Sequence, residues 1–160
     1  MEEFWLLMLD RAEHGRQVVI PARKPGTVLL SDRSGFCTMA YQGAAMSEKL
    51  GLPLAATLEF IYRQWEAVAP LPDMVVLLDV TPEEAIRRLM ARGSLDDYET
   101  PEQLKAYRVG YAAALKYHKG HLLTIDTTRK DFENVVDEVV AGILETMDTA
   151  GIKGTQPIIP

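Results

Sequence analysis

Several residue types are scarce in this sequence, and each scarcity excludes a class of protein. The single cysteine, Cys37, cannot form a disulfide within the chain, so no disulfide-stabilised extracellular scaffold is implied. The three histidines lack the neighbouring ligands that a zinc site needs, so we predict no metal site built by protein side chains. No apolar run approaches the ~20 residues that a membrane-spanning helix requires.

Positive charge is also scarce. Seventeen lysines and arginines stand against 23 aspartates and glutamates, which gives a formal net charge of −6. General nucleic-acid binders and binders of anionic membranes need a basic face, so we expect neither kind of partner. A small anionic substrate remains compatible, because it needs only a few local arginines. The chain opens with Glu2 and Glu3, the wrong charge for a secretory signal, so we expect a cytoplasmic protein.

The composition that remains is that of a globular protein, with 48% hydrophobic and 25% charged residues over 160 positions. We predict a single α/β domain over residues 1–150 and an irregular tail over 151–160. Three short apolar runs are predicted as strands buried on both faces: Thr27–Ser31, Met74–Asp79 and Leu122–Asp126. Continuous apolar runs without polar alternation are typical of parallel strands that helices cover on both sides.

Helical segments separate these strands. Threonine followed by proline predicts a helix start at Thr81 and again at Thr100, each with a capping glutamate or glutamine three residues later. Apolar residues at helical spacing give two further amphipathic segments: Leu58, Ile61, Trp65 and Val68, then Leu104, Tyr107, Tyr111 and Leu115. A last helix is predicted from about Asp131 to Met147. The βαβαβα order predicts a parallel sheet.

Polar residues follow each predicted strand. Asp32 and Arg33 come directly after the first strand, and Asp79 and Asp126 end the other two. Ligands of open α/β sheets bind at the carboxyl ends of the strands, and an arginine there can bind a phosphate through two parallel hydrogen bonds. The residues alone leave open an ordinary surface role for Arg33. For Asp79 and Asp126 we favour helix caps or loop anchors over ligands.

The order and spacing of several segments resemble the thymidylate kinase family, over nearly the whole chain from Leu6 to Met147. The matching segments are Leu9-Asp10-Arg11-Ala12-Glu13-His14, Leu29-Leu30-Ser31-Asp32-Arg33-Ser34, Met39-Ala40-Tyr41-Gln42-Gly43, Leu78-Asp79-Val80-Thr81-Pro82-Glu83, Arg92-Gly93, Tyr98-Glu99, Arg108-x-Gly110-Tyr111 and Ile125-Asp126. The resemblance implies a P-loop NTPase-like nucleoside monophosphate kinase fold, a parallel sheet flanked by helices. It also implies transfer of a phosphoryl group from ATP to dTMP, giving dTDP, with Mg²⁺ as cofactor and a homodimer as assembly.

The resemblance also implies roles for individual residues. Arg33 would bind the acceptor phosphate, Asp32 would organise the transfer site, and Arg11 would reach the nucleotide. The acceptor pocket would further include Leu7, Thr38, Tyr41 and Gln42. Arg88 and Arg92, four residues apart on one helical face, would lead into the lid over the donor phosphates, with Arg92 as a catalytic residue.

One motif of the family is absent. None of the eleven glycines is followed by lysine, so no Walker A loop, Gly-x-x-x-x-Gly-Lys-Ser/Thr, is present to bind the donor phosphates and magnesium. By resemblance we expect the first βα unit to be missing, on the order of fifty residues. Its strand would lie between Thr27–Ser31 and Met74–Asp79. We therefore expect a truncated chain that is inactive alone, and poorly stable or oligomeric.

Two departures bear on specificity. Leu7 stands where the family usually has an aromatic residue that stacks on thymine, and Asp96-Asp97-Tyr98-Glu99 has an acid where the lid often has arginine. Two alternatives therefore stay open. One is a kinase for a deoxynucleoside or another nucleotide, and the other is a degenerate, non-catalytic protein of this fold that binds a nucleotide or a partner chain.

Overall fold

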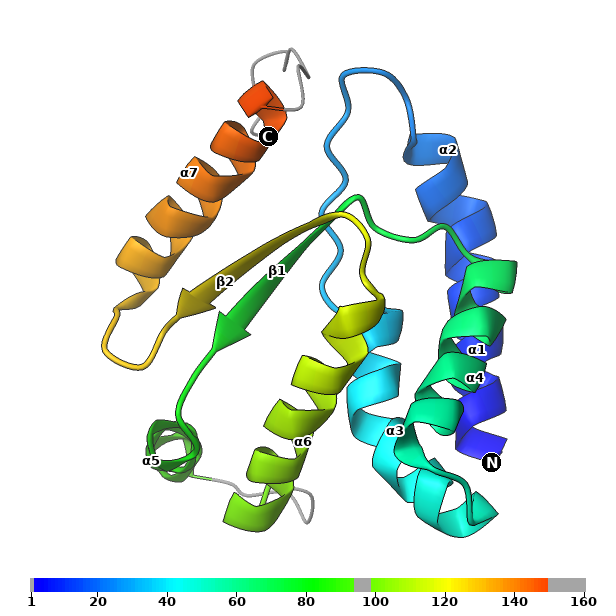
Figure 1. The fold of residues 1–160 in the computed structure, drawn as a ribbon. Helices are drawn as coiled ribbons and strands as arrows, with labels where there is room; N and C mark the ends of the chain where they lie inside the picture. Colours follow the sequence, from blue (N-terminus) through cyan, green and yellow to red (C-terminus); the bar gives the residue numbers. More distant parts are fainter. Residues whose placement is uncertain (1, 94–98, 150–160) are drawn as a thin grey trace. The chain divides into compact units, whose positions relative to one another are not determined.

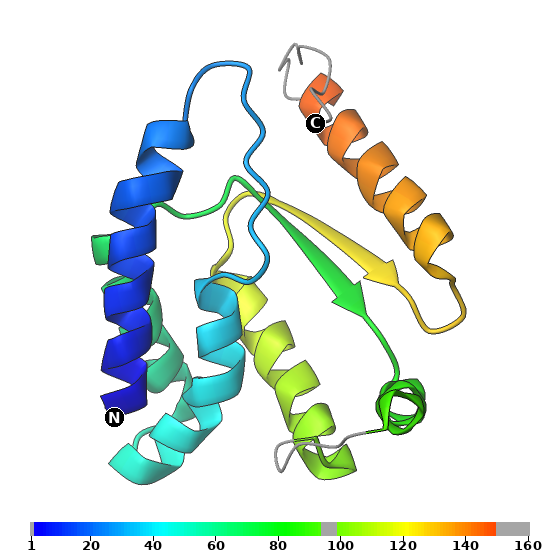
Figure 2. The same ribbon diagram turned by 180° about the vertical axis from the view of Figure 1, so that it is seen from behind.

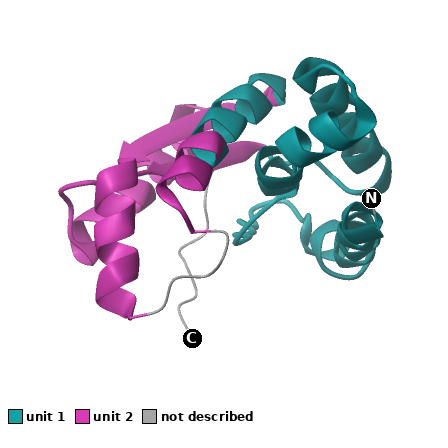
Figure 3. Ribbon diagram, turned by 90° about the horizontal axis from the view of Figure 1, so that it is seen from below, with its two compact units in different colours: residues 1–72, 107–117 teal, residues 73–106, 118–160 magenta. Residues whose placement is uncertain are grey.

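A computed structural model of the protein describes residues 2–93 and 99–149. The chain divides into two compact units, which are coloured separately in Figure 3. Unit 1 comprises residues 1–72 and 107–117, and unit 2 comprises residues 73–106 and 118–160. A chain that leaves and re-enters a unit in this way ties distant parts of the sequence together in each of them.

Unit 1 is helical. Helix α1 (Glu2–His14) continues through a π-helical stretch, Gly15–Val19, into the short α2 (Ile20–Ala22), as Figure 1 shows. Helices α3 (Gly35–Leu50) and α4 (Leu54–Val68) follow, and the second half of α6 (Pro101–Ala114) with the 3₁₀ turn Leu115–Tyr117 completes the unit. The core is formed by buried side chains of these helices: Phe4, Met8, Phe36, Met39, Leu58, Ile61, Tyr62, Trp65 and Leu115.

Helices α3 and α4 meet closely at the start of α3. A Cβ atom on Gly35 would lie 2.1 Å from the Trp65 ring, so only glycine fits there. The rings of Phe36 and Trp65 pack edge to face with centroids 4.9 Å apart. Ser34 caps the same helix end, because its Oγ accepts a hydrogen bond from the Phe36 backbone N–H at 3.3 Å. The start of α3, which directly follows Asp32 and Arg33, is therefore fixed in place.

Unit 2 contains the sheet. Strands β1 (Met74–Asp79) and β2 (His121–Asp126) pair in parallel, with Met74 opposite His121 and Asp79 opposite Asp126. Helix α5 (Pro82–Arg92) follows β1, and α7 (Phe132–Thr149) follows β2 and packs on it (Figure 2). A Cβ atom on Gly142 of α7 would lie 2.4 Å from the Leu123 side chain, so this glycine lets α7 approach the strand.

Both predicted helix starts after threonine are confirmed. Thr81 Oγ1 accepts a hydrogen bond from the Glu84 backbone N–H at 3.4 Å at the start of α5. Thr100 and Gln103 form a reciprocal capping box at the start of α6, in which Thr100 Oγ1 accepts from the Gln103 N–H and Gln103 Oε1 accepts from the Thr100 N–H. The last predicted helix and the two strands of unit 2 are also confirmed.

The predicted strand Thr27–Ser31 is wrong. The segment is irregular, and Val28, Leu29 and Leu30 are 52%, 41% and 77% exposed. Its apolar residues favour extended structure, but a strand also needs a neighbouring strand to pair its backbone N–H and C=O groups. In the described residues this segment pairs with no strand.

The prediction that the other two strands are buried on both faces is also wrong. Ile125 is fully buried, but Leu78 and Leu122 are about half exposed, at 52% and 48%. Only two strands pair in the described residues, and the helix α7 packs on β2, so part of the apolar surface of the strands remains exposed. Within the described chain, no helix has both the length and the apolar composition needed to cross a membrane.

Candidate functional site

A pocket of about 280 Å³ in unit 1 brings two predicted site residues together. Arg11 of α1 and Asp32, from the segment that precedes α3, both line it. The remaining lining residues come from the same two stretches of chain: Asp10, His14, Val18, Leu29, Leu30 and Ser31. The pocket therefore combines the carboxyl-terminal end of α1 and its continuation with the loop that holds the Asp-Arg pair.

Arg11 is the positively charged residue of this pocket. Its Nε atom is buried and has no hydrogen-bond partner among the described residues. A buried donor without an acceptor costs on the order of 1–3 kcal/mol, and more when the group is charged. Arg11 lines the pocket, so an anionic group bound there would lie beside its positively charged side chain. This geometry suits the binding of a small anion.

Arg33 is not among the residues that line the pocket. Its backbone has φ = 67°, and it is the one described non-glycine residue with a positive φ. Such a conformation is strained for a residue with a Cβ atom. The Arg33 guanidinium carbon lies 5.7 Å from the centroid of the Tyr41 ring, and a hydrogen bond with Tyr41 raises the pKa of Arg33. Arg33 therefore contacts α3, while its neighbour Asp32 lines the pocket.

Two further acceptor-pocket residues lie on α3, near Tyr41. Thr38 is buried, at 3% exposed, and belongs to the packed interior of unit 1. Gln42 Nε2 donates a hydrogen bond to Glu3 Oε1 of α1 at 3.4 Å. Leu7 is half-buried on α1, one helical turn before Arg11. None of these three residues lines the pocket, so their roles in substrate binding stay predictions.

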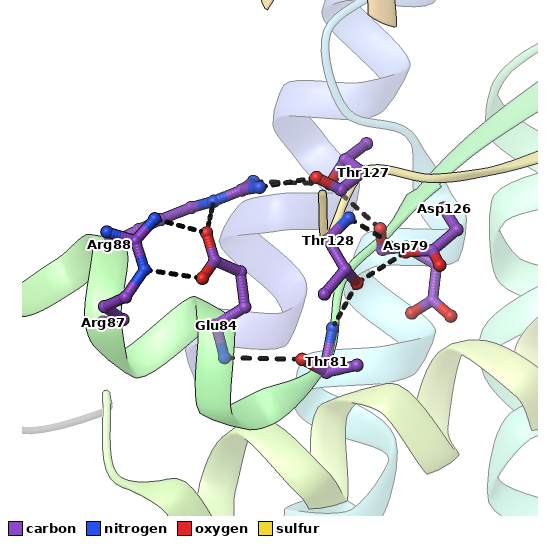
Figure 4. A network of polar contacts seen from close by, with 8 residues as sticks. All are labelled: Asp79, Thr81, Glu84, Arg87, Arg88, Asp126, Thr127 and Thr128. Atoms are coloured by element: carbon purple, nitrogen blue, oxygen red, sulfur yellow. Dashed lines mark hydrogen bonds and ion pairs between the residues drawn. The ribbon is translucent and has the colours of Figure 1, made fainter. Parts of the chain in front are cut away.

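Arg88 is tied to the carboxyl end of the sheet in unit 2. Its Nε donates to Glu84 Oε1 at 2.8 Å, and its Nη2 donates to the Thr127 carbonyl oxygen at 2.5 Å (Figure 4). Arg88 thereby connects α5 to the loop that follows β2. A donor phosphate would have to compete with these partners, so the lid role of Arg88 stays a prediction.

Glu84 holds this end of α5 together electrostatically. Hydrogen bonds from Arg87 and then Arg88 lower the pKa of Glu84 to about 2. The two Arg87 contacts measure 2.6 and 2.7 Å. The carboxylate is therefore ionised at neutral pH and fixes both guanidinium groups on the first turns of the helix.

Arg92 ends α5, and its Nη2 donates to both carboxylate oxygens of Glu99, at 2.9 and 3.1 Å. The other residues of the predicted acidic lid, Asp96, Asp97 and Tyr98, lie outside the described residues. The roles of Arg92 in catalysis and in the lid therefore stay predictions.

Asp126 anchors the loop that follows its strand, as we favoured over a ligand role. Its Oδ1 accepts hydrogen bonds from the Thr128 backbone N–H at 2.9 Å and from Thr128 Oγ1 at 2.5 Å. Thr128 Oγ1 in turn accepts from the Thr81 backbone N–H, which joins the two strand ends (Figure 4). At Asp79, the backbone carbonyl oxygen accepts from Thr127 N–H and Oγ1.

The structure adds residues to the pocket that sequence reasoning did not select. Asp10 and His14 both line it, and a signal was present, because they flank Arg11 in the segment Asp10-Arg11-Ala12-Glu13-His14. His14 lies three residues after Arg11 and therefore on the same side of the helix. The sequence predicts no metal-ligand role for His14, and the structure places it in the pocket wall.

The described residues contain no cluster of side chains that could hold a magnesium ion by itself. No group of three or more His, Cys, Asp or Glu side chains there is arranged to hold a metal ion. The lysine and hydroxyl of a Walker A loop are absent from the whole sequence. The residues present therefore do not fit the cofactor that the fold implies, and we derive no step through it.

Comparison with known proteins shows a family match that covers the segments around this pocket. The sequence profile of thymidylate kinase matches residues 1–139, which include all of the pocket-lining residues. The chain belongs to the thymidylate kinase family. Membership relates it to the nucleoside monophosphate kinases, which are transferases, and implies a P-loop NTPase fold; the parallel two-stranded sheet with flanking helices has the α/β character of that fold.

Individual relatives support the same assignment. The chain is 29% identical over 148 residues to a protein of Methanococcoides burtonii named "Probable thymidylate kinase", covering 91% of this chain and 72% of the relative. It is 29% identical over 153 residues to the thymidylate kinase of an Exiguobacterium strain, covering 94% and 69%. It is 35% identical over 147 residues to that of Xylella fastidiosa, covering 91% and 64%. The chain thus spans roughly two thirds of the length of these thymidylate kinase relatives.

Proposed function

We propose that this chain is the acceptor-binding part of a thymidylate kinase, and that it binds dTMP through the phosphate. In the complete enzyme the reaction would transfer the terminal phosphoryl group of ATP to dTMP and give dTDP. The observation that carries the proposal is Arg11, which lines the unit 1 pocket with a buried Nε that has no partner. The names of the relatives supply the nucleotide, and Arg11 supplies the positive charge in a pocket that Asp10 and Asp32 also line.

The proposed roles follow from chemistry at this pocket. Arg11 supplies hydrogen bonds and positive charge to the acceptor phosphate, and Arg33 does the same while its guanidinium stays beside the Tyr41 ring. Asp32 orients the arginines and organises the transfer site. Phosphoryl transfer depends mainly on positioning and on electrostatic stabilisation, so these charged groups would carry most of the acceptor side of the reaction.

The donor side is proposed to be incomplete. Arg88 and Arg92 would lead toward the donor phosphates, but no Walker A loop occurs in the 160 residues. We therefore infer that the first βα unit of the fold is not among these residues and that the chain alone does not turn over ATP. A homodimer and a cytoplasmic location belong to the same proposal.

Calorimetric titration of the chain with dTMP and with thymidine tests the proposal, because the two ligands differ only in the phosphate. We expect dTMP to bind at least tenfold more tightly, and Arg11→Gln to remove most of that difference, since a hydrogen bond to a charged group contributes about 1.5–3 kcal/mol. Arg16→Gln is the matched control: it removes a positive charge from an exposed residue near the end of α1 that pairs with Glu13. Equal affinity for the two ligands would reject a phosphate site, and tighter thymidine binding would favour a nucleoside kinase.

A further inference from the structure

Arg33 belongs to a cluster of three tyrosines in unit 1 that the proposed reaction does not explain. Tyr41 of α3 packs against Tyr107 of α6, with ring centroids 4.4 Å apart and planes inclined by 49°. Tyr41 also meets Tyr111 of α6 edge to face, with centroids 5.8 Å apart. The guanidinium carbon of Arg33 lies over the same Tyr41 ring, 5.7 Å from its centroid. Tyr41 therefore contacts both the two tyrosines of α6 and the guanidinium of Arg33.

The helix that carries the two tyrosines is held against α3 at a fixed distance. A Cβ atom on Gly110 would lie 2.6 Å from the carbonyl oxygen of Ala40, so the two backbones meet there and only glycine fits. Tyr107 and Tyr111 flank this contact and, being four residues apart, share one helical face. Their rings therefore have little freedom to withdraw from Tyr41.

Tyr111, the second α6 tyrosine of the cluster, is half-buried. Burial, and then hydrogen bonding with the Cys37 thiol, raises the pKa of Tyr111, so the phenol stays neutral. Tyr107 is half-buried and provides the closer ring contact. Of the two tyrosines, Tyr107 makes the closer contact with Tyr41, so Tyr107 is the residue to replace in a test.

The backbone of Arg33 makes this support necessary. Its positive φ is unfavourable for an arginine, and its side chain is exposed, so the loop alone does not select one position for the guanidinium. The Oγ of Ser31 donates to the Arg33 carbonyl at 3.1 Å, which fixes the backbone but not the side chain. A cation–π contact with the face of the Tyr41 ring would favour one position of the Arg33 guanidinium.

We propose that Tyr107 is a positioning residue that sets the place of Arg33 through Tyr41, and so prepares that arginine for the acceptor phosphate. The use of Arg33 on a phosphate rests on the proposed function, whereas the positioning itself does not. Loss of the Tyr107 ring would free Tyr41 to tilt, and the guanidinium would lose its preferred position before the ligand arrives. Binding would then include the cost of ordering Arg33.

Two measurements on the full chain test this inference. The first needs no ligand: the Nε–Hε resonance of Arg33, assigned by its loss in Arg33→Gln, reports the ring of Tyr41 through its upfield shift. We expect that shift in the wild-type chain and in Tyr107→Phe, which keeps the ring, and its loss in Tyr107→Ala. Tyr117→Ala is the matched control. Tyr117 lies in the same unit but outside the cluster, and its ring packs on that of Tyr62 with centroids 5.3 Å apart. An unchanged Arg33 resonance in Tyr107→Ala would overturn the inference.

The second measurement compares dTMP with thymidine. An aromatic pair or an exposed cation–π contact changes an equilibrium roughly two- to tenfold, so Tyr107→Ala should weaken dTMP binding by that factor and leave thymidine binding unchanged. Tyr107→Phe should restore the wild-type value. Equal weakening for both ligands would show general damage and overturn the inference. If the wild-type chain shows no preference for dTMP, the proposed function fails, and the ligand-free resonance still decides the positioning role.

Discussion

At the scale of single residues, the chain combines features that favour a phosphate with one that weakens base recognition. Arg11 has an unpaired buried donor, and Asp32 lines the same pocket. Leu7, one turn before Arg11 on α1, stands where relatives by resemblance carry an aromatic side chain. Leucine packs against a base but offers no π-face. The chain should therefore recognise the phosphate better than the thymine.

Leu7→Phe should restore base recognition. Stacking of a base on an aromatic side chain contributes about 1–3 kcal/mol, so we expect dTMP affinity to rise about fivefold or more, with thymidine gaining equally. Titration calorimetry measures both. Leu6→Phe is the control, because Leu6 is 66% exposed on the same helix. An unchanged or lower affinity for both ligands in Leu7→Phe would mean that the base does not reach this part of α1.

At the scale of elements, the sequence predicted those features that depend only on neighbouring residues, such as the starts of helices. Thr81 and Thr100 start their helices because a threonine hydroxyl at a helix end satisfies an otherwise unpaired backbone N–H, and that geometry is contained within four residues. The segment 27–31 could not be predicted in the same way. A strand depends on a partner elsewhere in space, and the apolar residues Val28, Leu29 and Leu30 do not reveal whether that partner is present.

The start of α5 gives a prediction about pH. Glu84 has a pKa lowered to about 2 by Arg87 and Arg88, from an ordinary value near 4.5. A carboxyl group whose pKa is lowered by folding contributes stability above the unfolded value and loses it as pH falls through the folded value. Its contribution should thus be complete above about pH 4.5 and vanish near pH 2.

Glu84→Gln makes this contribution measurable. At pH 7 we expect a melting temperature lower by roughly 1–4 °C, the effect of losing an exposed ion pair in a domain of this size. The difference from the wild-type chain should shrink as pH falls from 5 to 2. Glu83→Gln, on the neighbouring exposed residue, serves as control. A difference that persists unchanged at pH 2 would contradict the assigned role of the Glu84 carboxylate.

At the scale of the whole molecule, the resemblance predicted the family, and the family profile confirmed it over residues 1–139. The sequence predicts Arg11, Asp32 and Arg33 around one nucleotide site; the unit 1 pocket is lined by Arg11 and Asp32, and Arg33 is not among its lining residues. The sequence did not predict the contact between Arg33 and Tyr41. That contact depends on a backbone φ of 67° at Arg33 and on the packing of the tyrosine cluster, which are properties of the folded chain. Composition alone excluded partners but selected no ligand.

A crystal structure of the chain with bound dTMP would test the central claim most directly, because it locates the phosphate relative to the two arginines. The account predicts the phosphate in the unit 1 pocket, within hydrogen-bonding distance of Arg11, and the Arg33 guanidinium directed at it from beside the Tyr41 ring. A phosphate bound away from both arginines, or dTMP bound at a different surface with this pocket empty, would contradict it.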